Sequence, residues 1–258
     1  MRRPYLAGNW KMNLDRRSAA ELAGALRDYL DANQGGADID VGIFPSFVHL
    51  DEMARAMAGS QLIVGAQNCC DEESGAFTGE VSVAMLKDVG ASSVVLGHSE
   101  RRHIYGEADE LIGRKVALAL LGGLDVILCV GETREEREAG STETVVATQL
   151  RGGLAAVSAA DMDRVTIAYE PVWAIGTGLT ATPDQAQAVH AYLRGLLSSL
   201  YTDEVADSVR IQYGGSVKPS NAAELLSMAD IDGALVGGAA LTAENFIPIL
   251  EAGQAAAV

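Results

Sequence analysis

The chain has 258 residues, of which 48% are hydrophobic, and this is enough to bury one large core. Its net charge of −16 at pH 7 argues against nucleic acid as a partner, because neutralising phosphates requires a basic surface. No apolar run approaches the roughly 18 residues that span a membrane. The residues after Met1 do not resemble a signal peptide, so we expect a cytoplasmic protein.

The three cysteines offer neither a disulfide framework nor a metal site. Cys69 and Cys70 are adjacent and Cys129 lies within an apolar run, so no Cys-x-x-Cys pattern is present. The sequence also lacks a His-x-His motif and a cluster of histidine, cysteine and carboxylate residues. We therefore expect the cysteines to pack in the interior, and we expect no catalytic metal.

Short apolar and β-branched runs recur along the chain and predict eight strands, with helical patterns between them. The predicted strands begin at residue 6 and then cover residues 39–44, 62–66, 93–96, 126–130, 165–169, 209–212 and 233–236. The clearest helical patterns lie at residues 47–57, 80–87 and 189–200. Alternating strands and helices predict a parallel sheet of the α/β class.

Eight such units without a Pro/Ser-rich linker favour a single (β/α)8 barrel domain over residues 1–258. An open, doubly wound sheet is the alternative. The absence of a Gly-x-Gly-x-x-Gly fingerprint after the first strand counts against it.

The carboxyl ends of barrel strands carry the active residues, and here those ends are rich in polar groups. The first strand ends at Asn9 and Lys11, the fourth at His98 and Glu100, the fifth at Glu132 and the sixth at Glu170. Gly214-Gly215-Ser216 follows the seventh strand and Gly237-Gly238 the eighth. Glycine pairs at these two positions favour a phosphate site, because bare backbone amides can approach the anion.

The segment from residue 165 to 183 is the best candidate for the chemistry. A buried strand ends at Glu170, and the apolar loop after it carries Trp173 and ends at Thr182-Pro183, a predicted helix N-terminus with a capping box to Gln185. The loop is either a lid that excludes water from a site or a connection packed permanently against its neighbours. A lid beside Glu170 would desolvate the carboxylate and strengthen it as a base.

Several polar residues support this site in the predicted arrangement. His98 stands before a helix N-terminus, whose positive dipole end favours the neutral imidazole. Lys11 is the natural cation for an anionic substrate in so acidic a protein. Glu100 is either catalytic or an ion-pair partner for a nearby base, and we expect the second. We expect Glu132 and Tyr213 either to anchor the loop or to be ordinary loop residues.

The connection at residues 67–79 is long for a compact barrel. Its tip carries Phe77 and Thr78 beside acidic residues. Docking into a second subunit is the expectation, and a self-packed surface loop is the alternative.

Four sequence motifs are informative as a set. They are Asn9-Trp10-Lys11, Gly97-His98-Ser99-Glu100-Arg101-Arg102, the run from Tyr169 to Gly178, and Tyr213-Gly214-Gly215-Ser216. In this combination and order the chain closely resembles the triosephosphate isomerase family. Ala66-Gln67-Asn68, residues 75–80 and Val236-Gly237-Gly238 add to a match that covers essentially the whole chain.

The resemblance implies reversible interconversion of dihydroxyacetone phosphate and glyceraldehyde 3-phosphate through an enediolate, in glycolysis and gluconeogenesis, with no cofactor. It implies that Glu170 is the base and that neutral His98 polarises the carbonyl, while Lys11 and Asn9 stabilise substrate charge. The amides of Gly176, Ser216, Gly237 and Gly238 would hold the phosphate.

The resemblance also implies a homodimer in which Thr78 reaches the Lys11 region of a second copy. Leu179, Ala240 and Thr242 depart from residues frequent in the family, which concerns the rear of the loop and the capping of the last helix.

Two other functions fit the residues. A different phosphosugar isomerase or a class I aldolase would use the same barrel, and the aldolase would need a desolvated Schiff-base lysine. Of Lys11, Lys87, Lys115 and Lys218, only Lys11 is predicted to end a strand. A non-catalytic barrel that only binds phosphate is the other possibility, and it is disfavoured because Lys11, His98 and Glu170 are all present.

Overall fold

The computed structural model describes residues 2–33, 38–175 and 180–257, and in it eight parallel strands form a closed barrel. Neighbouring strands pair in chain order and β1 closes the ring against β8. The strands are β1 (Tyr5–Asn9), β2 (Asp40–Phe44), β3 (Leu62–Ala66), β4 (Ser93–Leu96), β5 (Asp125–Val130), β6 (Val165–Tyr169), β7 (Arg210–Tyr213) and β8 (Gly233–Val236). The predicted (β/α)8 architecture is therefore confirmed.

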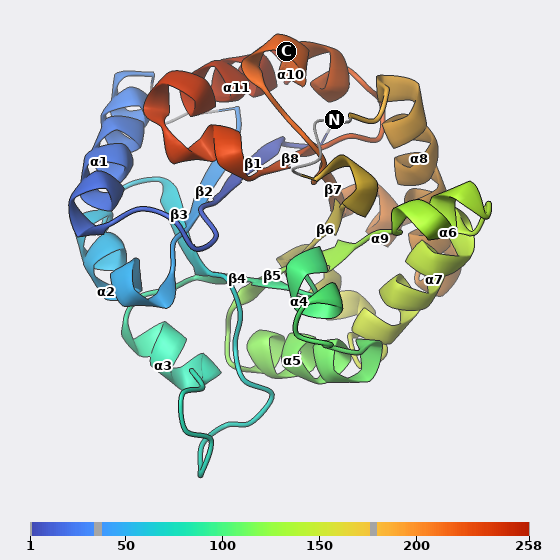
Figure 1. Cartoon of the computed structure of the whole chain (residues 1–258), viewed down its shortest axis with the longest axis horizontal. Helices are drawn as coiled ribbons and strands as arrows, with labels where there is room; N and C mark the ends of the chain where they lie inside the picture. Colours follow the sequence, from blue (N-terminus) through green and yellow to red (C-terminus); the bar gives the residue numbers. More distant parts are fainter. Residues whose placement is uncertain (1, 34–37, 176–179, 258) are drawn as a thin grey trace.

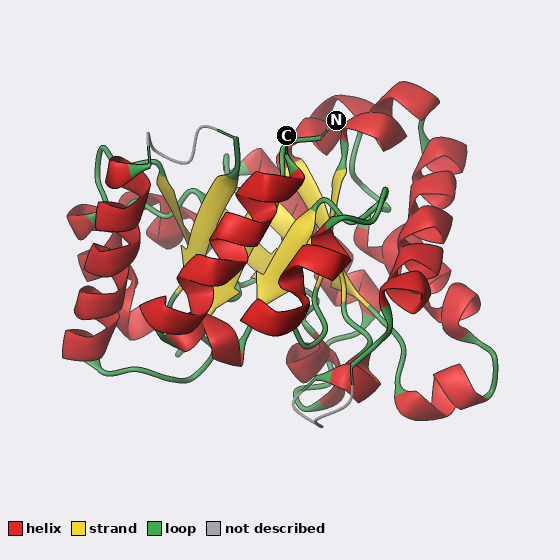
Figure 2. Cartoon of the chain, turned by 90° about the horizontal axis from the view of Figure 1, so that it is seen from above, coloured by secondary structure: helices red, strands yellow, loops and turns green. Residues whose placement is uncertain are grey.

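Helices surround the strands on the outside of the barrel, as Figures 1 and 2 show. They are α1 (Arg16–Ala32), α2 (Phe47–Ala56), α3 (Val83–Asp88), α4 (Ser99–His103), α5 (Asp109–Leu121), α6 (Arg134–Glu138), α7 (Thr142–Gly153), α8 (Pro183–Leu200), α9 (Asp203–Ser208), α10 (Pro219–Leu226) and α11 (Ala243–Ala256). Short 3-10 helices lie at Ala159–Arg164 (η1), Val172–Ala174 (η2) and Gly238–Leu241 (η3). Within the described ranges, no helix combines the length and apolar character needed to cross a membrane.

The helix starts follow local side-chain chemistry. Thr182 caps α8 through a hydrogen bond that its side chain accepts from the Gln185 amide, and Gln185 returns a bond to the Thr182 amide. This capping box is the predicted one. The helix expected from residue 80 begins instead at Val83, because the Ser82 side chain accepts a hydrogen bond from the Met85 amide and caps the helix there.

The alternation of the strands divides the apolar residues into two layers. One cluster fills the barrel interior and consists of Tyr5, Ala7, Phe44, Val95, Ile127, Cys129, Ala168 and Leu235. The larger cluster lies between the strands and the helices, where Leu6, Ile43, Leu96, Leu128 and Ile167 face outward from their strands. Burial on both faces explains why the strands read as nearly continuous apolar runs.

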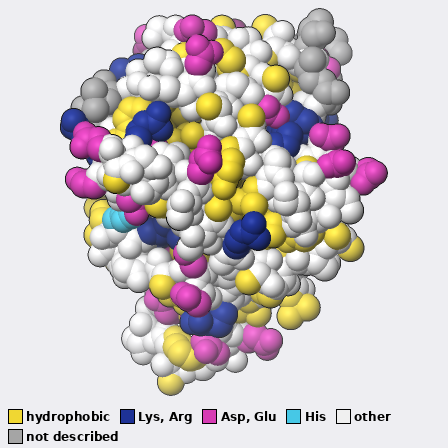
Figure 3. Space-filling view, turned by 90° about the vertical axis from the view of Figure 1, so that its right-hand side faces the viewer, with side chains coloured by type: hydrophobic (Ala, Val, Ile, Leu, Met, Phe, Trp, Pro, Cys, Tyr) yellow, Lys and Arg dark blue, Asp and Glu magenta, His cyan; other side chains and the backbone are white. Residues whose placement is uncertain are grey.

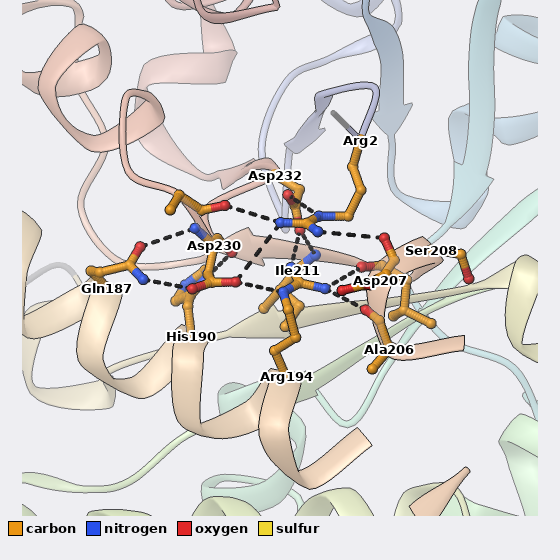
Figure 4. Close-up of polar contacts among 12 residues, drawn as sticks. Arg2, Gln187, His190, Arg194, Ala206, Asp207, Ser208, Ile211, Asp230 and Asp232 are labelled. Carbon is orange, nitrogen blue, oxygen red and sulfur yellow. Dashed lines mark hydrogen bonds and ion pairs between the residues drawn. The ribbon is translucent and has the colours of Figure 1, made fainter. Parts of the chain in front are cut away.

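A partly buried ionic cluster ties the starts of the last strands to α8 and to the N-terminal segment (Figure 4). Arg194 of α8 pairs with Asp230 at 2.6 Å and with Asp232 at 2.5 Å. Arg2 pairs with Asp232 at 2.6 Å, and the Ile211 amide donates to the same carboxylate. Asp232 thus joins the N-terminal segment, β7 and β8 on the side of the barrel opposite the carboxyl ends of the strands.

Candidate active site

A cleft of about 860 Å³ opens at the carboxyl ends of the strands. It is lined by residues that follow five different strands, among them Asn9, Lys11, His98, Glu170, Ser216, Gly237 and Gly238. The closed barrel thus brings together candidates that lie up to 229 positions apart in sequence. Gly176 and Leu179 lie outside the described residues.

Glu170 follows β6 and its carboxylate is almost completely buried. His98 Nε2 lies 2.9 Å from its Oε1, and the Ser99 amide donates to its Oε2 at 2.9 Å. Burial acts to raise the pKa of Glu170, but the His98 ring, the Ser99 amide and Lys11 outweigh it and hold this pKa below its ordinary value. The expectation that a lid would strengthen this base by desolvation concerns a loop whose residues 176–179 lie outside the described residues.

His98 presents a defined tautomer to the cleft. The Glu100 amide donates a hydrogen bond to His98 Nδ1 at 3.2 Å, so Nδ1 acts as an acceptor. The ring proton then resides on Nε2, which donates to Glu170. The ring is therefore a neutral hydrogen-bond donor, as the helix that begins at Ser99 suggests.

Lys11 reaches the cleft from the turn after β1. Its backbone has φ of 51°, a left-handed conformation, and is held there by three contacts. Its amide donates to Asn9 Oδ1, and its carbonyl accepts from Ser46 Oγ and Gln67 Nε2. Its Nζ lies 2.7 Å from Glu100 Oε1, which confirms the ion-pair partner expected for Glu100.

The glycine loops after β7 and β8 line the cleft beside Lys11. The 3-10 helix η3 begins at Gly238, and a Cβ on Gly237 would lie 3.4 Å from Lys11 Cε. Near this loop, Ala240 is buried, and Thr242 caps α11 through its side chain. Lys218 also lines the cleft, so Lys11 does not stand alone there among the lysines.

A second group of polar contacts lies behind Glu170. Glu132 is fully buried and accepts hydrogen bonds from the Tyr169 hydroxyl and from Trp173 Nε1, each at 3.0 Å. Tyr213 is buried close to the Ala181 backbone, and burial raises the pKa of Tyr213 to about 12. Trp173 and Ile175 are half-buried.

Three residues that contribute to this arrangement were not predicted from the sequence. A Cβ on Gly131 would lie 1.8 Å from the carbonyl oxygen of Glu170, so only glycine permits this approach. Gln149 holds Gly131 through bonds to both its amide and its carbonyl. Arg137 pairs with Glu132 at 3.0 Å. A buried carboxylate such as Glu132 needs a counter-charge, and this need is the signal that could have pointed to Arg137.

Phe77 and Thr78 lie outside the cleft. The segment between β3 and α3 that carries them extends beyond the ring of helices, as Figure 1 shows. Both side chains are exposed. The described residues contain no group of three histidine, cysteine or acidic residues placed to hold a metal ion.

Comparison with known proteins identifies the family. The family model for triosephosphate isomerase matches residues 4–253. Proteins named triosephosphate isomerase are 51% identical in Chloroherpeton thalassium, 53% in Carboxydothermus hydrogenoformans and 54% in Treponema denticola. These alignments cover 98%, 97% and 96% of this chain and 100%, 99% and 98% of the relatives. The chain therefore belongs to the triosephosphate isomerase family.

Proposed function

We propose that this cleft interconverts dihydroxyacetone phosphate and glyceraldehyde 3-phosphate, with Glu170 as the base and His98 as the electrophile. The observation that carries the assignment is the 2.9 Å contact between Glu170 Oε1 and His98 Nε2. It pairs an ionised carboxylate with a neutral imidazole donor at one point in the cleft. Proton removal next to a carbonyl requires this combination of a base and a stabiliser for the developing oxyanion.

Substrate that enters between these two groups would replace their mutual hydrogen bond. Glu170 would then take a proton from one carbon and return it to the neighbouring carbon, and an enediolate would form between the two transfers. His98 Nε2–H would hydrogen-bond to the substrate oxygens as charge develops on them. It would give its proton to the former carbonyl oxygen and take the proton of the substrate hydroxyl in return, so that the second oxygen becomes the new carbonyl. The Ser99 amide keeps Glu170 ionised until the proton arrives.

Lys11 would neutralise charge on the substrate, and Asn9 would stabilise it through its polar side chain. Lys11 Nζ stands beside Gly237, so one cation serves both the reacting oxygens and the phosphate end. The amides of Ser216, Gly237 and Gly238 bind the phosphate, and Gly176 is proposed to join them. The hydrogen bond from Trp173 to Glu132 anchors the start of the loop that follows Glu170, and Tyr213 is proposed to contact the end of that loop.

The protein is proposed to act as a single-domain barrel over residues 1–258 and to form homodimers in the cytoplasm. Large apolar side chains are exposed after three adjacent strands: Met12 after β1, Val48 after β2 and Phe77 after β3. Phe77 and Thr78 would contact the second copy. Acidic and basic side chains are interspersed on the face in Figure 3. Together with the net charge of −16, this mixed surface argues against a nucleic-acid partner.

The direct test is turnover of glyceraldehyde 3-phosphate by the purified chain, with the product coupled to a nicotinamide-linked dehydrogenase. We expect rapid turnover without added metal or cofactor. Lys11→Met should raise KM more than it lowers kcat, because it removes charge that binds the substrate anion. Absence of turnover in the folded parent would contradict the proposed function.

A further inference from the structure

The buried carboxylate of Glu132 is surrounded by hydrogen-bond donors. Its Oε1 accepts from the Tyr169 hydroxyl, Trp173 Nε1 and Arg137 Nη1, each at 3.0 Å, and its Oε2 accepts from the same hydroxyl. Trp173 Nε1 and the Arg137 guanidinium can only donate, so these contacts favour the carboxylate form of Glu132. Its side chain is fully removed from solvent.

Arg137 is the counter-ion of this charge. Within the described ranges it is the only cationic side chain paired with Glu132. Its guanidinium also lies 4.7 Å from the centre of the Trp173 ring, in a cation–π arrangement. Arg137 thus contacts both the buried acid and the aromatic side chain bonded to it.

Backbone hydrogen bonds join the same region to the segment that carries Glu170. The Val172 amide donates to the Glu132 carbonyl at 3.0 Å, and the Glu170 amide donates to the Val130 carbonyl at 2.8 Å. Trp173 is three residues after Glu170 and is held by its indole. Side-chain and backbone bonds therefore tie the segment from Glu170 to Trp173 against the end of β5.

We propose that Arg137 is a positioning residue for the catalytic base. It neutralises Glu132 and stacks on Trp173, and it thereby fixes the segment that sets the location of the Glu170 carboxylate. The inference rests on the proposed function, in which Glu170 moves the proton. Arg137 itself does not line the cleft.

The test compares Arg137→Met with Arg134→Met, which changes the same residue type on the same short helix. Among the residues that the structure describes, Arg134 forms an ion pair with Glu138 alone, and both side chains are 65% exposed. Arg137→Met should lower kcat by about 10-fold to 100-fold, because small displacements of a reacting group carry costs of this order. KM should stay within about 3-fold of the parent value, since the phosphate-binding amides lie on other strands. Arg134→Met should leave both constants unchanged.

Two further variants separate positioning from a purely structural role. Arg137→Lys keeps the charge but loses the planar stack, so its kcat should lie between those of the parent and Arg137→Met. In a Glu132→Gln background the buried charge is gone, and Arg137→Met should then lower kcat by a smaller factor than in the parent.

The possible failures are distinguishable. Parent-like kcat in folded Arg137→Met and Arg137→Lys would overturn the inference and leave the proposed function intact. Equal kcat factors for Arg137→Met in both backgrounds would also overturn it. An inactive parent would instead contradict the proposed function.

Discussion

Glu170 and His98 restrain each other while the cleft has no substrate between them. The carboxylate is held by the His98 ring and the Ser99 amide, and the ring is held by the Glu100 amide at its other nitrogen. Each restraint also sets a protonation state, because donors favour the ionised acid and an amide at Nδ1 requires the neutral ring. The two side chains are therefore oriented and charged for proton transfer before substrate binds.

A substitution at Gly131 can displace Glu170 and leave its carboxylate chemically unchanged. It therefore tests how strongly turnover depends on where the base lies. Gly131→Ala would place a Cβ 1.8 Å from the Glu170 carbonyl oxygen, so the backbone of one of the two segments must move. We expect kcat to fall about 100-fold while the protein remains folded. Steady-state kinetics beside circular dichroism measure both effects. Parent-like kcat would mean that Glu170 tolerates this displacement.

The sequence is informative about side chains that stand at strand ends and less so about those that support them. Lys11, His98 and Glu170 could be predicted because each lies within two residues of the end of a recognisable strand. Gly131 and Arg137 could not, since their importance depends on the close approach of β5 and β6 and on the burial of Glu132. The close approach of two strands and the burial of a side chain result from packing. A single sequence contains no motif that predicts them.

At the scale of elements, the strand predictions were accurate where apolar runs have sharp ends. β3, β4, β6 and β8 match the predicted ranges, whereas β7 begins at Arg210 and ends at Tyr213, one residue later at each end than predicted. The sequence predicts a strand that begins at Val209, includes Arg210 and leaves Tyr213 in the loop that follows. Pairing with β6 extends the strand to Tyr213, opposite Tyr169.

Helix α8 contains a buried histidine that makes stability depend on pH. His190 Nδ1 donates to the Asp230 carbonyl at 3.0 Å, and the ring packs edge-on against Tyr169. Burial lowers the pKa of His190 to about 4. The unfolded chain therefore binds a proton at this residue between pH 6.5 and 4 while the folded protein does not, and stability is lost as the pH falls through this window.

His190→Gln should remove this contribution. The free energy of unfolding of the parent should fall more steeply between pH 6.5 and 4 than that of the variant, by on the order of 3 kcal/mol. Denaturant unfolding at a series of pH values measures the difference. His103→Gln, at an exposed histidine, is the control and should retain the slope of the parent. Identical slopes for the parent and His190→Gln would show that the buried ring does not resist protonation.

At the scale of the whole molecule, the segment between β3 and α3 extends away from the barrel (Figure 1), and its Phe77 side chain is exposed. The base of this segment is held by Asn68, which accepts a hydrogen bond from buried Lys115. An exposed aromatic side chain on an anchored projection is suited to a protein–protein contact.

Phe77→Asp should therefore weaken the proposed homodimer. We expect the parent to sediment as a dimer and the variant to shift toward monomer on dilution, because a charge would be buried in the interface. Leu121→Asp is the control, since Leu121 is 80% exposed at the end of α5, on the side where the strands begin. A monomeric parent would contradict the dimer directly.

The proposed mechanism depends on proton transfer by one buried carboxylate, and the turnover of Glu170→Gln measures this most directly. We predict that kcat falls by about 10³-fold or more while the circular dichroism spectrum and thermal midpoint stay close to those of the parent. Glu135→Gln, an exposed acid on α6, should keep full activity. Turnover by folded Glu170→Gln within a few-fold of the parent would contradict the assignment of the base, and with it the mechanism proposed for this cleft.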